Sequence, residues 1–256
     1  MSTVIYESKN NVSYIYLNRP ERYNALNKQM LEDLLSVLED VEKNEDRVII
    51  LAGKGNAFCA GGDIGMMEAF AEKKFFDEVM DLIGKVALKL YMMPKIVVSA
   101  IQGSAAGLGL SLALTADYVV AQKEAKLGML FIGIGLAPDG GGHFLLKERL
   151  GRQMAKQFIW GLKQVDGAQA KSMGLVDMVT EESVGEYTAK FTTKLMTTPL
   201  KAMLKTKMLY HSKNKEELVN YLNEEHKIQW ELKNTEDHKE GVQAFLEKRK
   251  PHFKGN

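Results

Sequence analysis

Cysteine is almost absent from this chain of 256 residues, which has Cys59 alone. A single cysteine cannot form a disulfide within the chain, so we expect a reducing compartment such as the cytoplasm. The amino-terminal residues show no basic segment followed by an apolar one, and this pattern predicts no signal peptide.

Long apolar runs and an excess of charge are missing as well. The longest apolar run covers 127–137, about half of the roughly 20 residues that a membrane-spanning helix needs. The formal net charge is +1 and the pI is 7.7, so we expect neither nucleic acid nor an anionic membrane as a partner. The composition therefore predicts a soluble protein, and 45% hydrophobic residues suffice for a sizeable core.

Strand-like and helix-like segments alternate along most of the chain. Short apolar runs that are typical of strands cover 12–17, 47–52, 96–101 and 118–121. Apolar residues at helical spacing cover 27–42, 66–91 and 109–116. This alternation predicts an α/β fold with mainly parallel strands over 1–195. Residues 196–256 carry amphipathic helical patterns and are predicted to form a helical region.

One aspartate stands in a segment that would keep it from water. Asp139 follows an apolar run and lies within 133–142, which is rich in glycine. Burial there would raise its pKa and suit it to proton transfer near neutral pH. The alternative is a turn in which Asp139 caps the following helix.

Two glycine-rich turns follow predicted strands, at 58–63 and 103–109. Small residues let a ligand approach the backbone, and free N–H groups at a helix start can bind an oxyanion. Tight connections between strand and helix would look the same.

Two further motifs are incomplete. Residues 53–58 begin like a dinucleotide fingerprint but have phenylalanine in place of the third glycine. Residues 109–113 approach the nucleophile elbow of a serine hydrolase, with Ser111, Asp139 and His143 in the chain order of a triad. Ser111 fits equally well as a small polar residue inside a helix.

Taken together, several segments resemble the crotonase (enoyl-CoA hydratase/isomerase) superfamily. The matching segments are 18–26, 58–64, 101–109, 138–142 and 240–253. They cover nearly the whole chain in collinear order. The resemblance implies a crotonase spiral of ββα turns, with an acyl-CoA-binding core over 1–195 and a C-terminal α-helical trimerisation region over 196–256.

The resemblance also implies a site. Members of the superfamily bind acyl-CoA and hold the thioester oxygen between two backbone N–H groups, which by motif position are those of Gly62 and Leu108. Substrate and CoA contacts fall by the same matching on Arg22, Ala25, Ala60, Gly61, Gly62, Asp63, Ile64, Phe131, Phe245 and Lys248. No metal and no cofactor beyond the CoA of the substrate are implied, and similar proteins form homotrimers or hexamers.

The departures from the family pattern bear on the reaction. Hydratases of this family use two glutamates, whose matching positions here are Ser111 and Phe131, and Asp139 stands where they usually have glycine. This arrangement resembles the 1,2-epoxyphenylacetyl-CoA isomerase branch, so we predict an isomerase with Asp139 as acid and base.

Other activities stay open at this point. They are an enoyl-CoA hydratase that recruits another carboxylate such as Glu68, a dehalogenase of aromatic acyl-CoA, a non-catalytic acyl-CoA binder, and a serine hydrolase through Ser111. Met66 and Met67 are predicted to line an acyl pocket, because they follow the turn at 60–64 directly.

Overall fold

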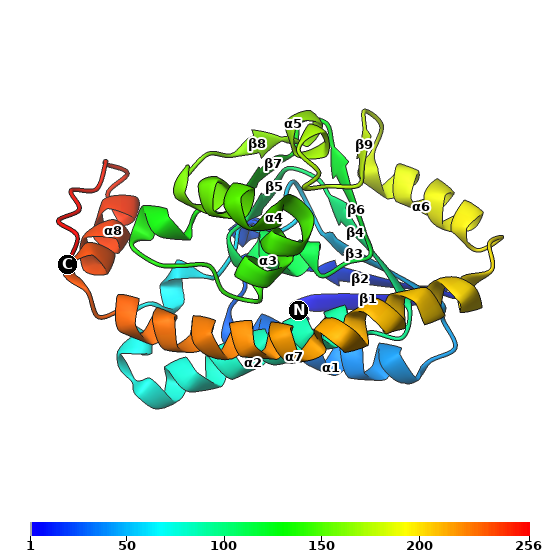
Figure 1. Ribbon diagram of the computed structural model, residues 1–256, viewed down its shortest axis with the longest axis horizontal. Coiled ribbons are helices and arrows are strands. Elements are labelled where there is room, and N and C mark those ends of the chain that lie inside the picture. The colour runs from blue at the N-terminus through cyan, green and yellow to red at the C-terminus, as the bar shows by residue number, and fades with distance from the viewer. Residues whose placement is uncertain (1) are drawn as a thin grey trace.

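The computed structural model describes residues 2–256, and a sheet of six strands forms its centre (Figure 1). The strand order is β1-β2-β3-β4-β6-β9, where only β1 and β2 pair in antiparallel fashion. The strands are β1 (Val4–Lys9), β2 (Val12–Leu17), β3 (Val48–Gly53), β4 (Ile96–Ile101), β6 (Tyr118–Gln122) and β9 (Met178–Thr180). The predicted α/β fold with mainly parallel strands is confirmed.

A second, smaller sheet stands at the carboxyl end of β4. It contains β5 (Ser104–Ala106), β7 (Lys126–Gly128) and β8 (Val165–Asp166) in the order β5-β7-β8. β5 follows β4 after two residues, so the chain passes from one sheet to the other almost without a loop. Strands this short carry too few residues for a periodic pattern, and the sequence did not predict them.

Helices cover both faces of the large sheet. The helices are α1 (Lys28–Lys43), α2 (Lys73–Tyr91), α3 (Leu108–Leu114), α4 (Gly142–Trp160), α5 (Gly167–Ser172), α6 (Val184–Leu195), α7 (Leu200–Leu232) and α8 (Glu236–Leu246). Short 3₁₀ turns are η1 (Pro20–Arg22), η2 (Ile64–Met66), η3 (Ala69–Ala71) and η4 (Phe131–Ile134). The segment predicted as helical over 66–91 thus consists of 3₁₀ turns followed by α2.

The two faces of the sheet pack into two cores. Ile49 and Leu51 of β3 belong to the larger core, which also contains the buried faces of α1 and α2. Val48 and Ile50 face the other side, where Val184 of α6 is buried with them. Because both faces are covered, β3 is a continuous apolar run without alternation.

Helix α7 runs along the molecule beside α2 and also contacts α4 (Figure 1). Several of its buried residues are polar, among them Lys207, Glu225 and Gln229. The Lys207 ammonium lies 2.7 Å from the Asp117 carboxylate and donates to the Lys95 carbonyl at 2.8 Å. These bonds satisfy the buried charge and attach α7 to the parallel sheet.

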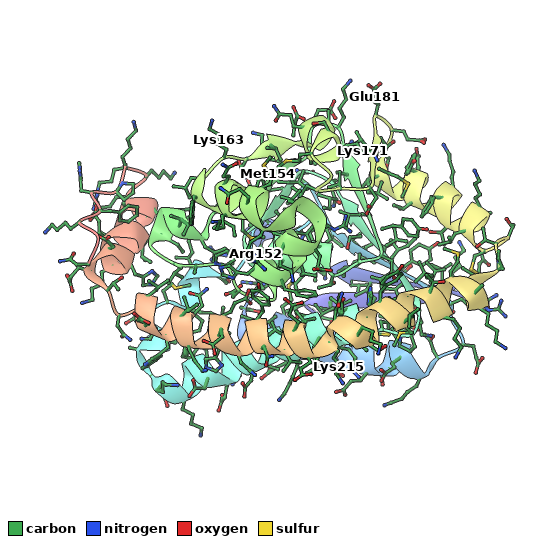
Figure 2. The ribbon with its side chains drawn as sticks, viewed as in Figure 1. Arg152, Met154, Lys163, Lys171, Glu181 and Lys215 are labelled. Atoms are coloured by element: carbon green, nitrogen blue, oxygen red, sulfur yellow. The ribbon has the colours of Figure 1, made fainter. Side chains whose placement is uncertain are left out.

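Exposed side chains at the periphery are often long and charged. Lys163 and Glu181 project outward from the upper edge in the view of Figure 2, Lys171 donates a hydrogen bond to the Asp177 carbonyl, and Arg152 and Met154 are exposed on α4. Among residues 2–256, no helix combines the length and the apolarity that crossing a membrane requires.

The packing of α3 on the turn at 58–63 leaves no room for a side chain at Gly109. A β-carbon there would lie 2.6 Å from the Cys59 carbonyl oxygen and 2.7 Å from Cys59 Sγ. We expect Gly109→Ala to destabilise the fold by about 1–3 kcal/mol, because backbone must shift. Urea unfolding measures this.

Gly84, in the interior of α2, is the matched control. A β-carbon at Gly84 would meet nothing within 4 Å, so Gly84→Ala should stabilise the protein by about 0.5–1 kcal/mol. Equal stability of the two variants would contradict the close packing of α3.

Candidate active site

The parallel pairing of β3 with β4 brings the two glycine-rich turns together, because the carboxyl ends of both strands lie at one edge of the sheet. The Cys59 amide donates to the Ser104 carbonyl at 3.0 Å, and the Ala106 amide donates to the Cys59 carbonyl at 3.0 Å. The turns at 58–63 and 103–109 are therefore joined backbone to backbone.

A cavity of about 370 Å³ opens beside the joined turns. Eight of the residues that the resemblance assigned to the site line it: Ala60, Gly61, Gly62, Ile64, Leu108, Phe131, Asp139 and Phe245. Most of the remaining wall is apolar, and the part that comes from the stretch from η2 to α2 includes Met66, Met67, Phe70, Phe76, Met80 and Ile83. Met66 and Met67 lie in the cavity wall, as expected, while their contact with an acyl group stays a prediction.

Two backbone amides on the cavity wall have no acceptor. Within residues 2–256, neither the Gly62 N–H nor the Leu108 N–H donates a hydrogen bond. Leu108 is the first residue of α3, so its amide has no partner in the preceding turn of helix. A β-carbon on Gly61 would lie 3.7 Å from Leu108 N and 2.9 Å from the Ala106 carbonyl oxygen, which shows how closely the turns approach.

Four of the predicted contact residues do not line the cavity. Arg22 and Lys248 are exposed, and Ala25 is partly buried outside the cavity wall. The Asp63 carboxylate accepts hydrogen bonds from Arg19 Nη1 at 2.8 Å and from the Gly65 amide at 3.0 Å. Asp63 therefore stabilises the turn itself, and a CoA contact of these four residues stays a prediction.

Asp139 lies three residues before the first residue of α4 and is buried, with an exposed fraction of 7%. Its Oδ2 accepts a hydrogen bond from Gln229 Nε2 at 3.1 Å, while its Oδ1 has no partner within the described chain. Burial raises the pKa of Asp139 to about 8; the neighbouring Glu225 carboxylate adds to the rise and the Gln229 hydrogen bond opposes it.

Helix α7 contributes residues that sequence reasoning missed. Gln229 and Lys233 line the cavity, and Gln229 also donates to the Ala137 carbonyl at 2.8 Å. Glu225 accepts from the amides of Gly141 and His143. No local pattern marks these residues, since the helix places glutamate and glutamine on its buried face at positions where an amphipathic pattern expects apolar side chains.

Ser111, Asp139 and His143 do not form a triad. The Ser111 hydroxyl is fully buried and its nearest polar partner is the Gly107 carbonyl oxygen at 3.5 Å. The His143 ring contacts Glu225 through Nδ1 at 2.8 Å. Within residues 2–256, no hydrogen bond links these three side chains, and Ser111 lacks the base that a nucleophile needs.

Comparison with known proteins assigns the family. The profile of the family described as "Enoyl-CoA hydratase/isomerase" matches residues 7–256. The chain belongs to the enoyl-CoA hydratase/isomerase family, within the crotonase superfamily.

Individual relatives carry both activities in their names. YhaR of Bacillus subtilis, which is named provisionally as an enoyl-CoA hydratase/isomerase, is 46% identical and covers 99% of each chain. The 1,2-epoxyphenylacetyl-CoA isomerase of Escherichia coli is 32% identical over 100% of this chain and 99% of its own. The structure of an enoyl-CoA hydratase from Mycobacterium avium subsp. paratuberculosis superposes with a TM-score of 0.90, at 28% identity and 99% coverage of both chains.

The raised pKa of Asp139 makes stability depend on pH. Its folded pKa of about 8 exceeds the ordinary value of 3.8, so the folded state holds this proton more tightly than the unfolded state. The contribution of Asp139 to the free energy of unfolding is fully present below about pH 4 and is lost as the pH rises to about 8. The free energy of unfolding falls by up to about 1.4 kcal/mol per pH unit in this range. Asp139→Asn should remove this loss.

Urea unfolding of wild type and Asp139→Asn at pH 5 and pH 8.5 tests the assignment. The variant should gain stability over wild type as pH rises. Asp40→Asn, at an exposed position of α1, should show no such trend. A constant difference across this range would rule out a buried Asp139 with a raised pKa.

Proposed function

We propose that this protein is an isomerase of enoyl-CoA thioesters in which Asp139 moves the proton. The observation that carries the proposal is the composition of the cavity wall. Among the lining residues of the described chain, Asp139 is the single acidic side chain, and the free amides of Gly62 and Leu108 stand on the same wall. Such a wall suits proton transfer beside a thioester carbonyl.

The proposed reaction moves one proton. The Asp139 carboxylate removes a proton from the carbon α or γ to the thioester, and the electron pair of the broken C–H bond is delocalised in a dienolate whose negative charge lies on the thioester oxygen. The Gly62 and Leu108 amides stabilise the charge on that oxygen. Asp139 then returns the proton to the other carbon, so the double bond migrates and the enzyme returns to its initial state.

Hydration makes a further demand on the site. It needs a positioned water and two groups for proton transfer, which in hydratases of this family are two glutamates. Their matching positions are Ser111, which is fully buried against the Gly107 carbonyl, and Phe131, which lines the cavity with a ring. Glu68 is exposed and outside the cavity wall. These placements favour isomerisation over hydration.

The acyl group in this proposal is apolar. The wall formed by η2, η3 and α2 presents Met66, Phe70, Met80 and Ile83 to the cavity. Methionine side chains adapt to irregular apolar shapes, so the wall suits aliphatic chains of different length. We assign the CoA nucleotide to the exposed side, near Arg22 and Lys248, and no cofactor beyond this CoA takes part.

The decisive assay offers the protein 2-enoyl-CoA and 3-enoyl-CoA separately and follows interconversion by chromatography. Asp139→Asn should lower turnover by about 10²–10⁴-fold, because proton transfer loses its base, and should leave binding of the CoA ester largely intact. Asp40→Asn is the matched surface control and should keep wild-type turnover.

Three outcomes would overturn the proposal. Formation of 3-hydroxyacyl-CoA as the main product would identify a hydratase. Binding without turnover would identify an acyl-CoA binder. Near-normal activity of Asp139→Asn would remove Asp139 from the mechanism.

The apolar wall generates a test of acyl selectivity. Met80→Trp places a larger ring on the wall, so kcat/KM for a long-chain 3-enoyl-CoA should fall about tenfold more than for a short-chain one. Met154→Trp, on the exposed face of α4, should leave this ratio unchanged. An equal loss for both substrates in Met80→Trp would show that the acyl chain does not reach this wall.

A further inference from the structure

Helix α7 presents two buried polar residues to the segment that carries Asp139. Glu225 and Gln229 lie one helical turn apart on one face of the helix, with exposed fractions of 2% and 3%. Gln229 contacts the Asp139 carboxylate and the Ala137 carbonyl, which lie on either side of Pro138. The helix therefore holds this segment by hydrogen bonds on both sides of Pro138.

Glu225 is surrounded by donors. Its Oε2 accepts from the Gly141 amide at 2.7 Å, and its Oε1 accepts from the His143 amide at 3.1 Å and from His143 Nδ1 at 2.8 Å. Three donors on two oxygens match an ionised carboxylate. The amino terminus of α4 adds a partial positive charge, which helps to keep a buried negative charge at this place.

Few other charges face Asp139. They are Glu225 of α7 and Lys233, which directly follows α7 and lies on the cavity wall, and His143 of α4 contacts Glu225. The three atoms nearest to a β-carbon on the adjacent Gly140 belong to Leu108 and Ser111 of α3 and to Ile83 of α2, and none of these side chains is titratable. Glu225 and the Gln229 amide are therefore the groups that distinguish the surroundings of Asp139 from a plain apolar cavity.

We propose that Glu225 and Gln229 are positioning residues that act on the protonation of Asp139 in opposite directions. The Gln229 amide donates to Oδ2, which favours the ionised carboxylate and leaves Oδ1 without a hydrogen-bond partner in the described chain. The Glu225 carboxylate repels a second negative charge and favours the protonated form. The catalytic consequence rests on the proposed function, whereas the titration of Asp139 does not.

The opposed effects of the two residues bring the pKa of Asp139 close to neutral pH. Burial alone, with only the repulsion of Glu225, would hold the carboxyl protonated and useless as a base. The Gln229 hydrogen bond alone would favour a weak base that is ionised throughout. Together the two residues allow the carboxyl to take up a proton and to release it in the same turnover.

The test is a titration of Asp139 itself in the full-length protein. The aspartate side-chain carboxyl carbons are labelled with ¹³C, and the Asp139 resonance is identified by its loss in Asp139→Asn. Glu225→Gln should lower the titration midpoint by about one pH unit, and Gln229→Met should raise it by about one pH unit. The pH at which kcat/KM changes because Asp139 ionises should shift by the same amount as the titration midpoint in each variant.

Glu231→Gln is the matched control. Glu231 lies on an exposed face of α7, and its substitution removes the same charge from the same helix. The Asp139 midpoint should stay at the wild-type value. Thermal unfolding checks that each variant is folded, and the Gln229→Met titration decides the proposal if Glu225→Gln does not fold.

The outcomes separate this proposal from the proposed function. Midpoints that move in opposite directions support the positioning roles even if no isomerase activity is found. Unmoved midpoints in folded variants, or movement in one common direction, would overturn the positioning roles even if Asp139→Asn is inactive. A merely structural contribution of α7 would lower stability without opposed movement.

Discussion

The parallel pairing of β3 with β4 is the constraint on which the site depends. It sets the ends of two strands side by side, and the chain then continues from both ends as glycine-rich turns that bond to each other through Cys59, Ser104 and Ala106. Gly109 lets α3 rest directly on Cys59. The result is a rigid corner of backbone on the cavity wall, where the Gly62 and Leu108 amides have no acceptor within the described chain.

The buried carboxyl of Asp139 lowers the stability of the fold. An unpartnered oxygen in an apolar cavity typically costs about 1–3 kcal/mol, and a bare charge there would cost far more. The structure limits this cost by one hydrogen bond from Gln229 and by a raised pKa that keeps Asp139 protonated for much of the time. Such a compromise is typical of a functional site, since stability alone would favour an apolar residue.

Much of the fold could be predicted because its signals are local. The strands at 12–17 and 96–101 are apolar runs bounded by turn residues, and glycine and small residues mark the turns where ligand can approach the backbone. The burial of Asp139 followed from the apolar run that precedes it. The very short strands β5 and β8 could not be predicted, because two or three residues show no period.

The contribution of α7 could not be predicted from pattern either. An amphipathic helix is expected to bury its apolar residues, yet Ile228 of α7 is 37% exposed while Glu225 and Gln229 are buried. These two residues are buried because they satisfy groups more than 80 positions earlier in the chain. Pairing of this kind depends on tertiary structure, and a single sequence contains no local trace of it.

The late position of α7 in the chain has a consequence for biosynthesis. A ribosome completes Asp139 and both glycine turns before it reaches Leu200, where α7 begins. Until that helix docks, the Asp139 carboxyl has neither its hydrogen bond from Gln229 nor the Glu225 carboxylate beside it. The surroundings that raise the pKa of Asp139 are therefore complete only after the last quarter of the chain has been translated.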